Sequence, residues 1–137
     1  MATPHRNPEP PLARPRRRRS SDAIRGLVRE TRLTPDRLVL PLFICEGSNK
    51  AEPIGAIPGR SRLSIDLTVR ECEAAMALGV KSVCLFPQIP AQLKTADGRE
   101  ALNEGNLLVR TIRAIKKQLP EMCVMTDVDL DPYSRDG

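Results

Sequence analysis

Three short apolar runs alternate with two amphipathic segments, and this alternation constrains the fold more than any other feature of the chain. The runs cover residues 38–45, 82–86 and 122–126. Continuous apolar runs of this length are typical of strands that are buried on both faces of a parallel sheet. Pro41 lies inside the first run and has no N–H to donate, which predicts a bulge or an unpaired start there.

Helical periodicity fills both intervals between the runs. The first interval has Asp66 as its expected N-cap, Gly79 at its C-terminal cap, and apolar residues three or four apart at Val69, Cys72, Met76 and Val80. The second begins at Asn106, ends before Pro120, and carries its stripe at Leu108, Ile112, Ile115 and Leu119. A shorter helix, capped by Ser20 or Ser21, precedes the first run, with Ile24, Leu27 and Val28 on one face.

The resulting order is helix, strand, helix, strand, helix, strand, which predicts an α/β fold of right-handed βαβ units on a parallel sheet. The polar stretch 46–63 is expected to be a loop with room for a small hairpin. A length of 137 residues bounds the chain to one domain. A (β/α)₈ barrel needs eight strands in about 250 residues. Three strands therefore form an incomplete sheet, with two edges and one face open.

The positive charge of the chain is concentrated in residues 1–19. This segment holds six of the 22 basic residues and one of the 17 acidic ones, so the remainder is neutral. Five of the 13 prolines also lie there, and no apolar periodicity does. We therefore divide the chain into an Arg/Pro-rich arm (1–19) and a folded body (20–137). The arm has three readings: an oligomer-embracing arm, a phosphate-binding clamp or a solvated tail. The absence of interleaved aromatic residues argues against nucleic acid.

The cysteines indicate a reducing compartment. Each of the four, at positions 45, 72, 84 and 123, sits in an apolar segment, and none forms a C-x-x-C pair. No apolar run reaches the length of a membrane span, and no secretory leader follows the basic start. These features predict a cytoplasmic protein without a membrane partner.

Four carboxylates follow the third run, at Asp127, Asp129, Asp131 and Asp136. On an extended chain the first three point to one face. Carboxylates at the carboxyl end of a parallel strand are a common way to build a metal or acid–base site. The other interpretation is a solvated tail, because like charges raise one another's pKa unless a cation neutralises them.

Eight motifs in order resemble one enzyme family. They are LVRET (27–31), LVLPLF (38–43), IPG (57–59), LSID (63–66), LFP (85–87), DGRE (97–100), RAIK (113–116) and TDVDLDPY (126–133). Together they resemble porphobilinogen synthase, also called 5-aminolevulinic acid dehydratase, over about residues 14–137 and over only the first part of that family's longer chain. The resemblance implies the first three βα units of a (β/α)₈ TIM barrel.

The resemblance also implies an activity, a hydro-lyase reaction of haem biosynthesis. Two 5-aminolevulinate molecules condense to porphobilinogen in a homo-oligomer whose N-terminal arm embraces a neighbour. The family's two Schiff-base lysines correspond to positions beyond residue 137, so we expect this chain to be inactive alone. Its five lysines, at positions 50, 81, 94, 116 and 117, lack the apolar setting that makes an amine nucleophilic. The alternative is a non-catalytic module that joins or modulates oligomers of the full-length enzyme.

Site residues carry over only at the end of the chain. Asp127 matches a catalytic aspartate of the family. Asp129, Asp131 and Asp136 match the three metal positions that are cysteines in zinc-type members, so the resemblance implies Mg²⁺ and does not favour zinc. Two departures stand out: Asp129 adds a third charge, and Ser134-Arg135 replaces a longer His-Gly-His stretch.

Overall fold

The computed structural model describes residues 16–135, which form two compact units divided between Leu33 and Thr34. Most of the predicted arm, residues 1–15, and the predicted metal ligand Asp136 lie outside the described residues. Within residues 16–135, no helix is long and apolar enough to cross a membrane.

The first unit contains one short helix, α1 (Asp22–Val28), after a 3₁₀ turn at Arg17–Arg19. The Ser21 hydroxyl accepts a hydrogen bond from the Ile24 N–H at 3.2 Å, which confirms the predicted cap at the second of the two candidate serines. Inside the helix, Arg25 pairs with Asp22. The predicted apolar face is exposed in this unit, and Leu27 retains 84% of its accessible surface.

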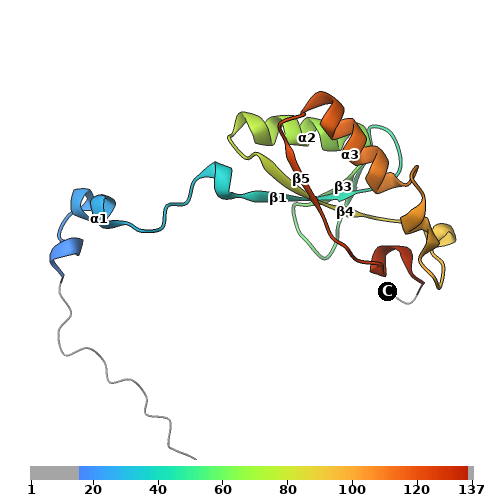
Figure 1. Ribbon diagram of the computed structural model, residues 1–137, viewed down its shortest axis with the longest axis horizontal. Coiled ribbons are helices and arrows are strands. Elements are labelled where there is room, and N and C mark those ends of the chain that lie inside the picture. Colours follow the sequence, from blue (N-terminus) through green and yellow to red (C-terminus); the bar gives the residue numbers. More distant parts are fainter. Residues whose placement is uncertain (1–15, 136–137) are drawn as a thin grey trace, which may run out of the picture. The chain divides into compact units, whose positions relative to one another are not determined.

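The second unit is a five-stranded sheet with two helices on one face (Figure 1). Its strands are β1 (Val39–Ile44), β2 (Ala51–Pro53), β3 (Ser61–Leu63), β4 (Ser82–Pro87) and β5 (Cys123–Thr126). The order across the sheet is β2-β3-β1-β4-β5. All neighbours are parallel except β2 and β3, which pair antiparallel. Helices α2 (Ile65–Ala77) and α3 (Leu107–Gln118) pack side by side.

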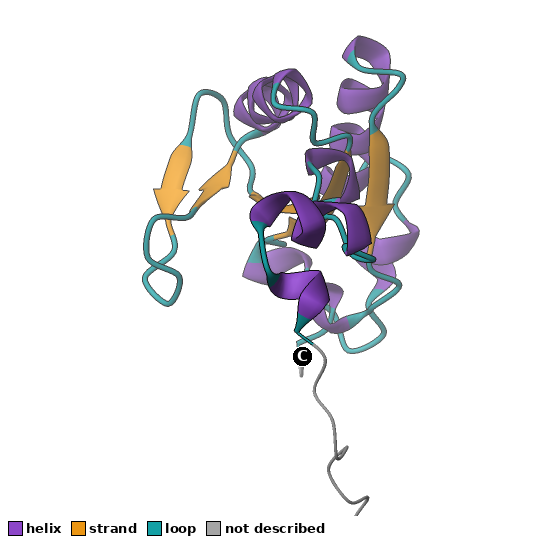
Figure 2. Ribbon diagram, turned by 90° about the vertical axis from the view of Figure 1, so that its left-hand side faces the viewer, coloured by secondary structure: helices purple, strands orange, loops and turns teal. Residues whose placement is uncertain are grey.

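The prediction of three strands was wrong in number, because the stretch 46–63 holds a hairpin that joins the sheet. Figure 2 shows its two short strands, which pair through Ala51 with Leu63 and Pro53 with Ser61. β3 then pairs with β1 only at Phe43 and Ile44, so Pro41 faces no partner on that side and keeps its register with Cys84 of β4. The unpaired start predicted at Pro41 is therefore present on the β3 side, without a bulge.

The cap predicted at Asp66 was also misplaced. The N-cap of α2 is Ser64, whose hydroxyl accepts from the Lys50 N–H at 3.0 Å and donates to the Asp66 carboxylate at 2.6 Å. Asp66 lies one residue inside the helix and also accepts from the Asn49 N–H. It therefore ties the helix start to the β1–β2 loop, a long-range contact that local sequence does not reveal.

The other helix ends follow their sequence signals. Gly79 follows α2 with a φ of 88°, in the left-handed region that favours glycine, and donates to the Met76 carbonyl. The Asn106 side chain caps α3 by accepting from the Val109 N–H at 2.8 Å. Ile115 of the predicted stripe of α3 is fully buried, and Leu108, Ile112 and Leu119 pack against the core while partly buried. The other buried positions, Leu107 and Thr111, lie one residue before Leu108 and Ile112.

One face of the sheet and the two helices enclose the core. Side chains that alternate along the strands meet those of α2 and α3 there. The buried core consists of Leu42, Ile44, Val83 and Leu85 from the strands, Val69, Cys72, Leu107 and Ile115 from the helices, and Met122 just before β5. The alternate side chains of the same strands point to the opposite face, where no helix of the described unit lies (Figure 1).

Candidate functional site

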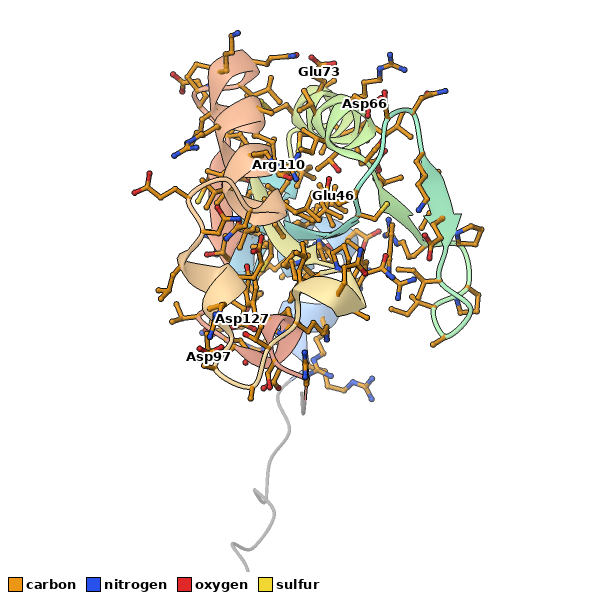
Figure 3. The ribbon with its side chains drawn as sticks, turned by 90° about the vertical axis from the view of Figure 1, so that its right-hand side faces the viewer. Glu46, Asp66, Glu73, Asp97, Arg110 and Asp127 are labelled. Atoms are coloured by element: carbon orange, nitrogen blue, oxygen red, sulfur yellow. The ribbon has the colours of Figure 1, made fainter. Side chains whose placement is uncertain are left out.

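The carboxyl ends of β1, β4 and β5 meet at one edge of the sheet, since the three strands are parallel and adjacent. Register aligns Phe43 of β1 with Phe86 of β4, and Leu85 with Thr126 of β5. The two phenylalanine rings lie 5.5 Å apart between centroids. The next residue after β5 is Asp127, which therefore enters the loops at this edge (Figure 3).

Two small hollows open at this edge. The first has a volume of about 60 Å³ and two carboxylates in its lining, from Asp127 and Asp129. Apolar side chains supply the rest of the wall; they are Leu85, Phe86, Pro87, Leu108, Pro132 and Tyr133. Both aspartates are largely exposed, so they lie at the mouth of the hollow rather than in its depth.

The second hollow is larger, about 240 Å³, and carries the opposite charge. Arg62 from β3 and Lys94 from the loop after β4 line it, together with Phe43, Phe86, Pro87, Gln88, Ile89 and Pro132. The two hollows share Phe86, Pro87 and Pro132. A carboxylate pair and a basic pair therefore face the solvent on either side of a shared apolar wall.

The predicted alignment of Asp127, Asp129 and Asp131 on one extended face was wrong. β5 ends at Thr126, and the chain turns at Leu130 into a 3₁₀ helix, Asp131–Tyr133. The Asp131 N–H donates to the Asp129 carboxylate at 3.1 Å, which draws the chain into this turn. Only Asp127 and Asp129 share a hollow, because the turn breaks the strand periodicity before Asp131.

A metal site requires several oxygens to converge on one point. Among residues 16–135, no three His, Cys, Asp or Glu side chains come close enough to hold an ion. Asp129 and Asp131 are linked across the turn through the Asp131 N–H, and their carboxylates are hard oxygen ligands of the kind that suits Mg²⁺ rather than Zn²⁺. The described residues contain these donors but do not gather them into a ligand cluster.

The lysines do not resemble activated amines. Hydrogen bonding and ion pairing with Glu52 raise the pKa of Lys50, opposite to what a Schiff-base lysine needs. The Lys116 ammonium donates to the Met122 carbonyl at 2.6 Å and to the Pro120 carbonyl. It therefore holds the end of α3 against the start of β5. Lys94 is the lysine that lines a hollow at the edge.

Sequence reasoning missed three features of this edge. Arg62 was taken as part of a loop, because a three-residue strand is too short to show alternation. Glu46, just after β1, pairs with Arg110 of α3 across 64 residues of sequence, a contact without any local signal (Figure 3). Tyr133, which is 5% exposed, is buried by the loop after β4. The pair Asp97-x-Arg99 was visible in the sequence, and its ion pair strongly lowers the pKa of the exposed Asp97 carboxyl.

Comparisons with known proteins agree on one family. The family model described as delta-aminolevulinic acid dehydratase matches residues 12–137. The Bradyrhizobium diazoefficiens protein of that name is 47% identical over 124 residues, which is 90% of this chain and 35% of the relative. The chloroplastic protein of Hordeum vulgare is 48% identical over 136 residues, which is 98% of this chain and 32% of the relative.

A solved structure agrees as well. The Toxoplasma gondii enzyme, crystallised with its product porphobilinogen, superposes with a TM-score of 0.84 at 40% identity, over 92% of this chain and 36% of that one. The mixed α/β fold of the second unit is therefore similar to that of porphobilinogen synthase. The chain spans about a third of the length of the curated relatives it matches.

Proposed function

The chain belongs to the delta-aminolevulinic acid dehydratase family, and we propose that it supplies the first three βα units of a (β/α)₈ barrel enzyme of tetrapyrrole biosynthesis. The proposed reaction condenses two 5-aminolevulinate molecules to porphobilinogen. The similarity to the product-bound Toxoplasma gondii enzyme supports the reaction class. The order of β1, α2, β4, α3 and β5 supports the placement in the barrel, since it supplies parallel strands linked by helices on one face.

The observation that carries this proposal is the position of Asp127. It follows β5 directly, at the carboxyl end of a parallel strand, and lines a hollow whose other walls are apolar. Barrel enzymes build their active sites from residues at this end of the strands. A carboxylate beside an apolar wall can hold the ammonium group of an amino acid substrate and accept a proton from it. Asp127 is therefore proposed as a catalytic residue.

We further propose that the Schiff-base amine comes from outside these 137 residues. The Lys50 amine is paired with Glu52, and the Lys116 amine is hydrogen-bonded to two carbonyls. Neither is desolvated as a nucleophilic lysine must be. The described residues thus contribute carboxylates and an apolar wall, and the polypeptide by itself is expected not to turn over substrate.

Asp129, Asp131 and Asp136 are the proposed ligands of Mg²⁺, on the strength of their oxygen chemistry. The bound ion would supply positive charge that stabilises developing negative charge on substrate oxygen. Asp129 and Asp131 would hold it from the turn after β5. Zinc is not proposed, because no thiolate or imidazole lies in this segment.

The assembly proposed here is a cytoplasmic homo-oligomer that contacts its neighbour through residues 1–19. The basic composition of that segment supports a partner surface rich in carboxylates. Some relatives carry a chloroplastic description, which belongs to those proteins.

A second candidate function has one structural observation in its favour. The sheet face opposite α2 and α3 exposes Val39 and Met125 by 43% and 42%, and apolar surface of this kind marks a contact with other protein. A non-catalytic module that joins oligomers of the full-length enzyme would use this face. Co-purification of the chain with a full-length relative, without a change in turnover, would favour the module.

Complementation tests the proposed function. The chain is mixed with a fragment that carries the remaining two-thirds of the Bradyrhizobium diazoefficiens relative, and porphobilinogen formation is measured. We expect no product from either piece alone and turnover from the pair. Asp127→Asn should lower turnover by about 100-fold or more, as expected for loss of a charged catalytic group.

Asp36→Asn is the matched control, since Asp36 precedes β1 at the opposite end of the strands. It should leave the rate of the pair unchanged. Product from the chain alone would contradict the proposed source of the amine. Full activity of the Asp127→Asn pair would contradict the role of Asp127.

A further inference from the structure

Two segments far apart in sequence lie against each other at the carboxyl edge of the sheet. Residues 94–98 follow β4, and residues 130–135 follow β5. The Thr95 N–H donates to the Tyr133 carbonyl at 3.2 Å, and Thr95 forms an isolated parallel bridge with Ser134. The Arg135 Nε donates to the Lys94 carbonyl at 3.0 Å, across 41 residues of sequence. Each of the two segments thus donates a hydrogen bond to the other.

Packing reinforces these hydrogen bonds. Tyr133 is 5% exposed although it lies in a turn at the edge of the fold. Gly98 adopts a left-handed φ of 61°, and a Cβ placed on it would lie 3.7 Å from Leu130 and 3.8 Å from Tyr133. The second segment therefore packs against the backbone of the first at Gly98.

Each segment is also internally fixed. In the first, the Thr95 hydroxyl donates to Asp97 at 2.6 Å and accepts from the Arg99 N–H at 3.1 Å, while Asp97 pairs with Arg99 at 3.0 Å. In the second, the N–H groups of Tyr133 and Ser134 both donate to the Leu130 carbonyl at 2.9 Å. Each of the two segments that meet is therefore a turn with its own internal hydrogen bonds.

The acidic residues of the candidate site lie in the short link between the end of β5 and this contact. Asp127 and Asp129 lie between Thr126, the last residue of β5, and Leu130, the first of the second segment. The Asp129 carboxylate accepts from the N–H of Asp131, which belongs to that segment. Pro132 lines both hollows, and Lys94 of the first segment lines the basic one.

We propose that residues 94–98 and 130–135 form a clasp that positions Asp127 and Asp129, with Thr95, Gly98, Tyr133 and Arg135 as positioning residues. The clasp fixes the far end of the short link that begins at β5, so the two carboxylates are held at the hollow from both ends. A displaced clasp also displaces Pro132, which is part of the wall that the two hollows share. This inference rests on the proposed function for its catalytic meaning, and its test is independent of turnover.

The chain contains a built-in probe of the clasp. Tyr133 is its only tyrosine, and it has no tryptophan. Acrylamide quenching of the tyrosine fluorescence therefore reports how far solvent reaches the Tyr133 ring, and hence whether the clasp is closed, without any label.

The experiment compares Arg135→Ala and Arg135→Lys in the full 137-residue chain. The alanine variant loses the donor to the Lys94 carbonyl, so the quenching constant of the tyrosine fluorescence should rise toward that of an exposed tyrosine. Lysine keeps one donor and should restore the low quenching constant. Arg113→Ala is the matched control, because Arg113 donates to the Glu104 carbonyl at 3.0 Å, away from the clasp, and it should change nothing.

Amide hydrogen exchange then tests whether the clasp positions the acidic residues or only packs the two segments against each other. In Arg135→Ala, the Thr95 and Asp131 amides should both exchange faster, since the bond from Asp131 to Asp129 depends on the clasp. Faster exchange at Thr95 with unchanged protection at Asp131 would overturn the positioning role. Unchanged exchange at both amides, or an unchanged quenching constant, would overturn the clasp itself.

A second pair of variants keeps the test decisive should Arg135→Ala fail to fold. Gly98→Asn retains a residue that tolerates the left-handed conformation, whereas Gly98→Val does not. We expect the valine variant, and not the asparagine variant, to raise the quenching constant and to speed exchange at Asp131. Equal behaviour of the two would contradict the proposal. Because none of these measurements uses turnover, failure of the proposed function would leave their outcome unaffected.

Discussion

The two faces of the sheet differ sharply, although the same strands supply both. On the helix-covered face, Ile44 and Val83 are fully buried. On the opposite face, Val39 and Met125 keep more than two-fifths of their accessible surface. The side chains exposed or half-exposed there alternate with the buried ones along the strands; they are Val39, Pro41, Phe43, Ser82, Cys84, Phe86, Cys123 and Met125.

This difference indicates that the strands are suited to burial on both faces, whereas the described residues bury only the face that packs against α2 and α3. An antiparallel sheet with a solvated face would show polar residues at alternate positions. Here both sets of alternate positions are mainly apolar. In a closed barrel the second face would be the interior, filled by side chains of other strands. The open face is therefore where the family's remaining strands are proposed to pack.

The largest predicted effect is a difference in the free energy of unfolding between substitutions on the two faces. Leu85→Ala removes a side chain that is 1% exposed and packs against the helices, so we expect a loss of about 3 kcal/mol. Met125→Ala on the open face should cost less than about 1 kcal/mol, because little buried surface is lost. Urea unfolding followed by circular dichroism measures both. Equal losses would mean that the open face is already covered, by self-association for example.

Thiol reactivity sharpens the same comparison residue by residue. Burial, aided by Glu71 and Glu73, raises the pKa of Cys72 in the core to about 11. At pH 8 very little thiolate forms there, whereas Cys123 is exposed on the open face. Iodoacetamide followed by peptide mass spectrometry should modify Cys123 at least about 100-fold faster than Cys72. Cys123→Ser is the control that assigns the fast phase. Comparable alkylation rates at Cys72 and Cys123 would contradict the difference between the two faces.

A smaller effect on the free energy of unfolding is expected at the N-terminus of α3. Asn106 is 3% exposed and caps α3 by accepting from the Val109 N–H. Asn106→Ala should lower the free energy of unfolding by about 1 kcal/mol. Asn106→Ser should restore part of it, because the serine oxygen also caps a helix and brings no charge into this buried position. Urea unfolding of the three chains measures this. A loss in the serine variant as large as in alanine would show that the cap is not the cause.

The smallest predicted effect concerns acid. The Ser64 hydroxyl and, to a lesser extent, the Asn49 N–H hold the pKa of Asp66 below its usual value of 3.8. A carboxyl with a lowered folded-state pKa stabilises the fold above its unfolded pKa, and this contribution is lost as the pH falls through the folded value. Asp66→Asn should therefore lower the Tm at about pH 7 and bring it close to that of the parent well below pH 3.8. A Tm difference that does not change with pH would contradict the ionic role of Asp66.

Much of this architecture was predictable because it is encoded locally. Apolar runs fixed β1, β4 and β5, and the helices followed from periodicity and from caps such as Asn106 and Gly79. Contacts across long sequence separations escaped prediction, including the pairing of β3 with β1, the Glu46–Arg110 pair and the capture of Asp66 by Asn49. These depend on tertiary packing, which no local pattern specifies.

The candidate site likewise contains features that the local sequence predicts and features that it does not. Asp127 was predictable, since a strand leads straight into it and eight motifs carried the family resemblance. The separation of Asp131 from Asp127 was not, because one hydrogen bond from the Asp131 N–H to Asp129 turns the chain after β5. The assignments of Asp127 to catalysis and of Asp129, Asp131 and Asp136 to a metal remain predictions.

The central claim is that the open face is the unfinished interior of a barrel, and the labelling rate of Cys123 tests it most directly. The rate is measured for the chain alone and for the chain mixed with the remaining two-thirds of the Bradyrhizobium diazoefficiens relative. The account predicts that the added strands slow the modification of Cys123 by about tenfold or more, while the slow rate of Cys72 stays unchanged. An unchanged rate at Cys123 in a mixture that forms porphobilinogen would contradict it.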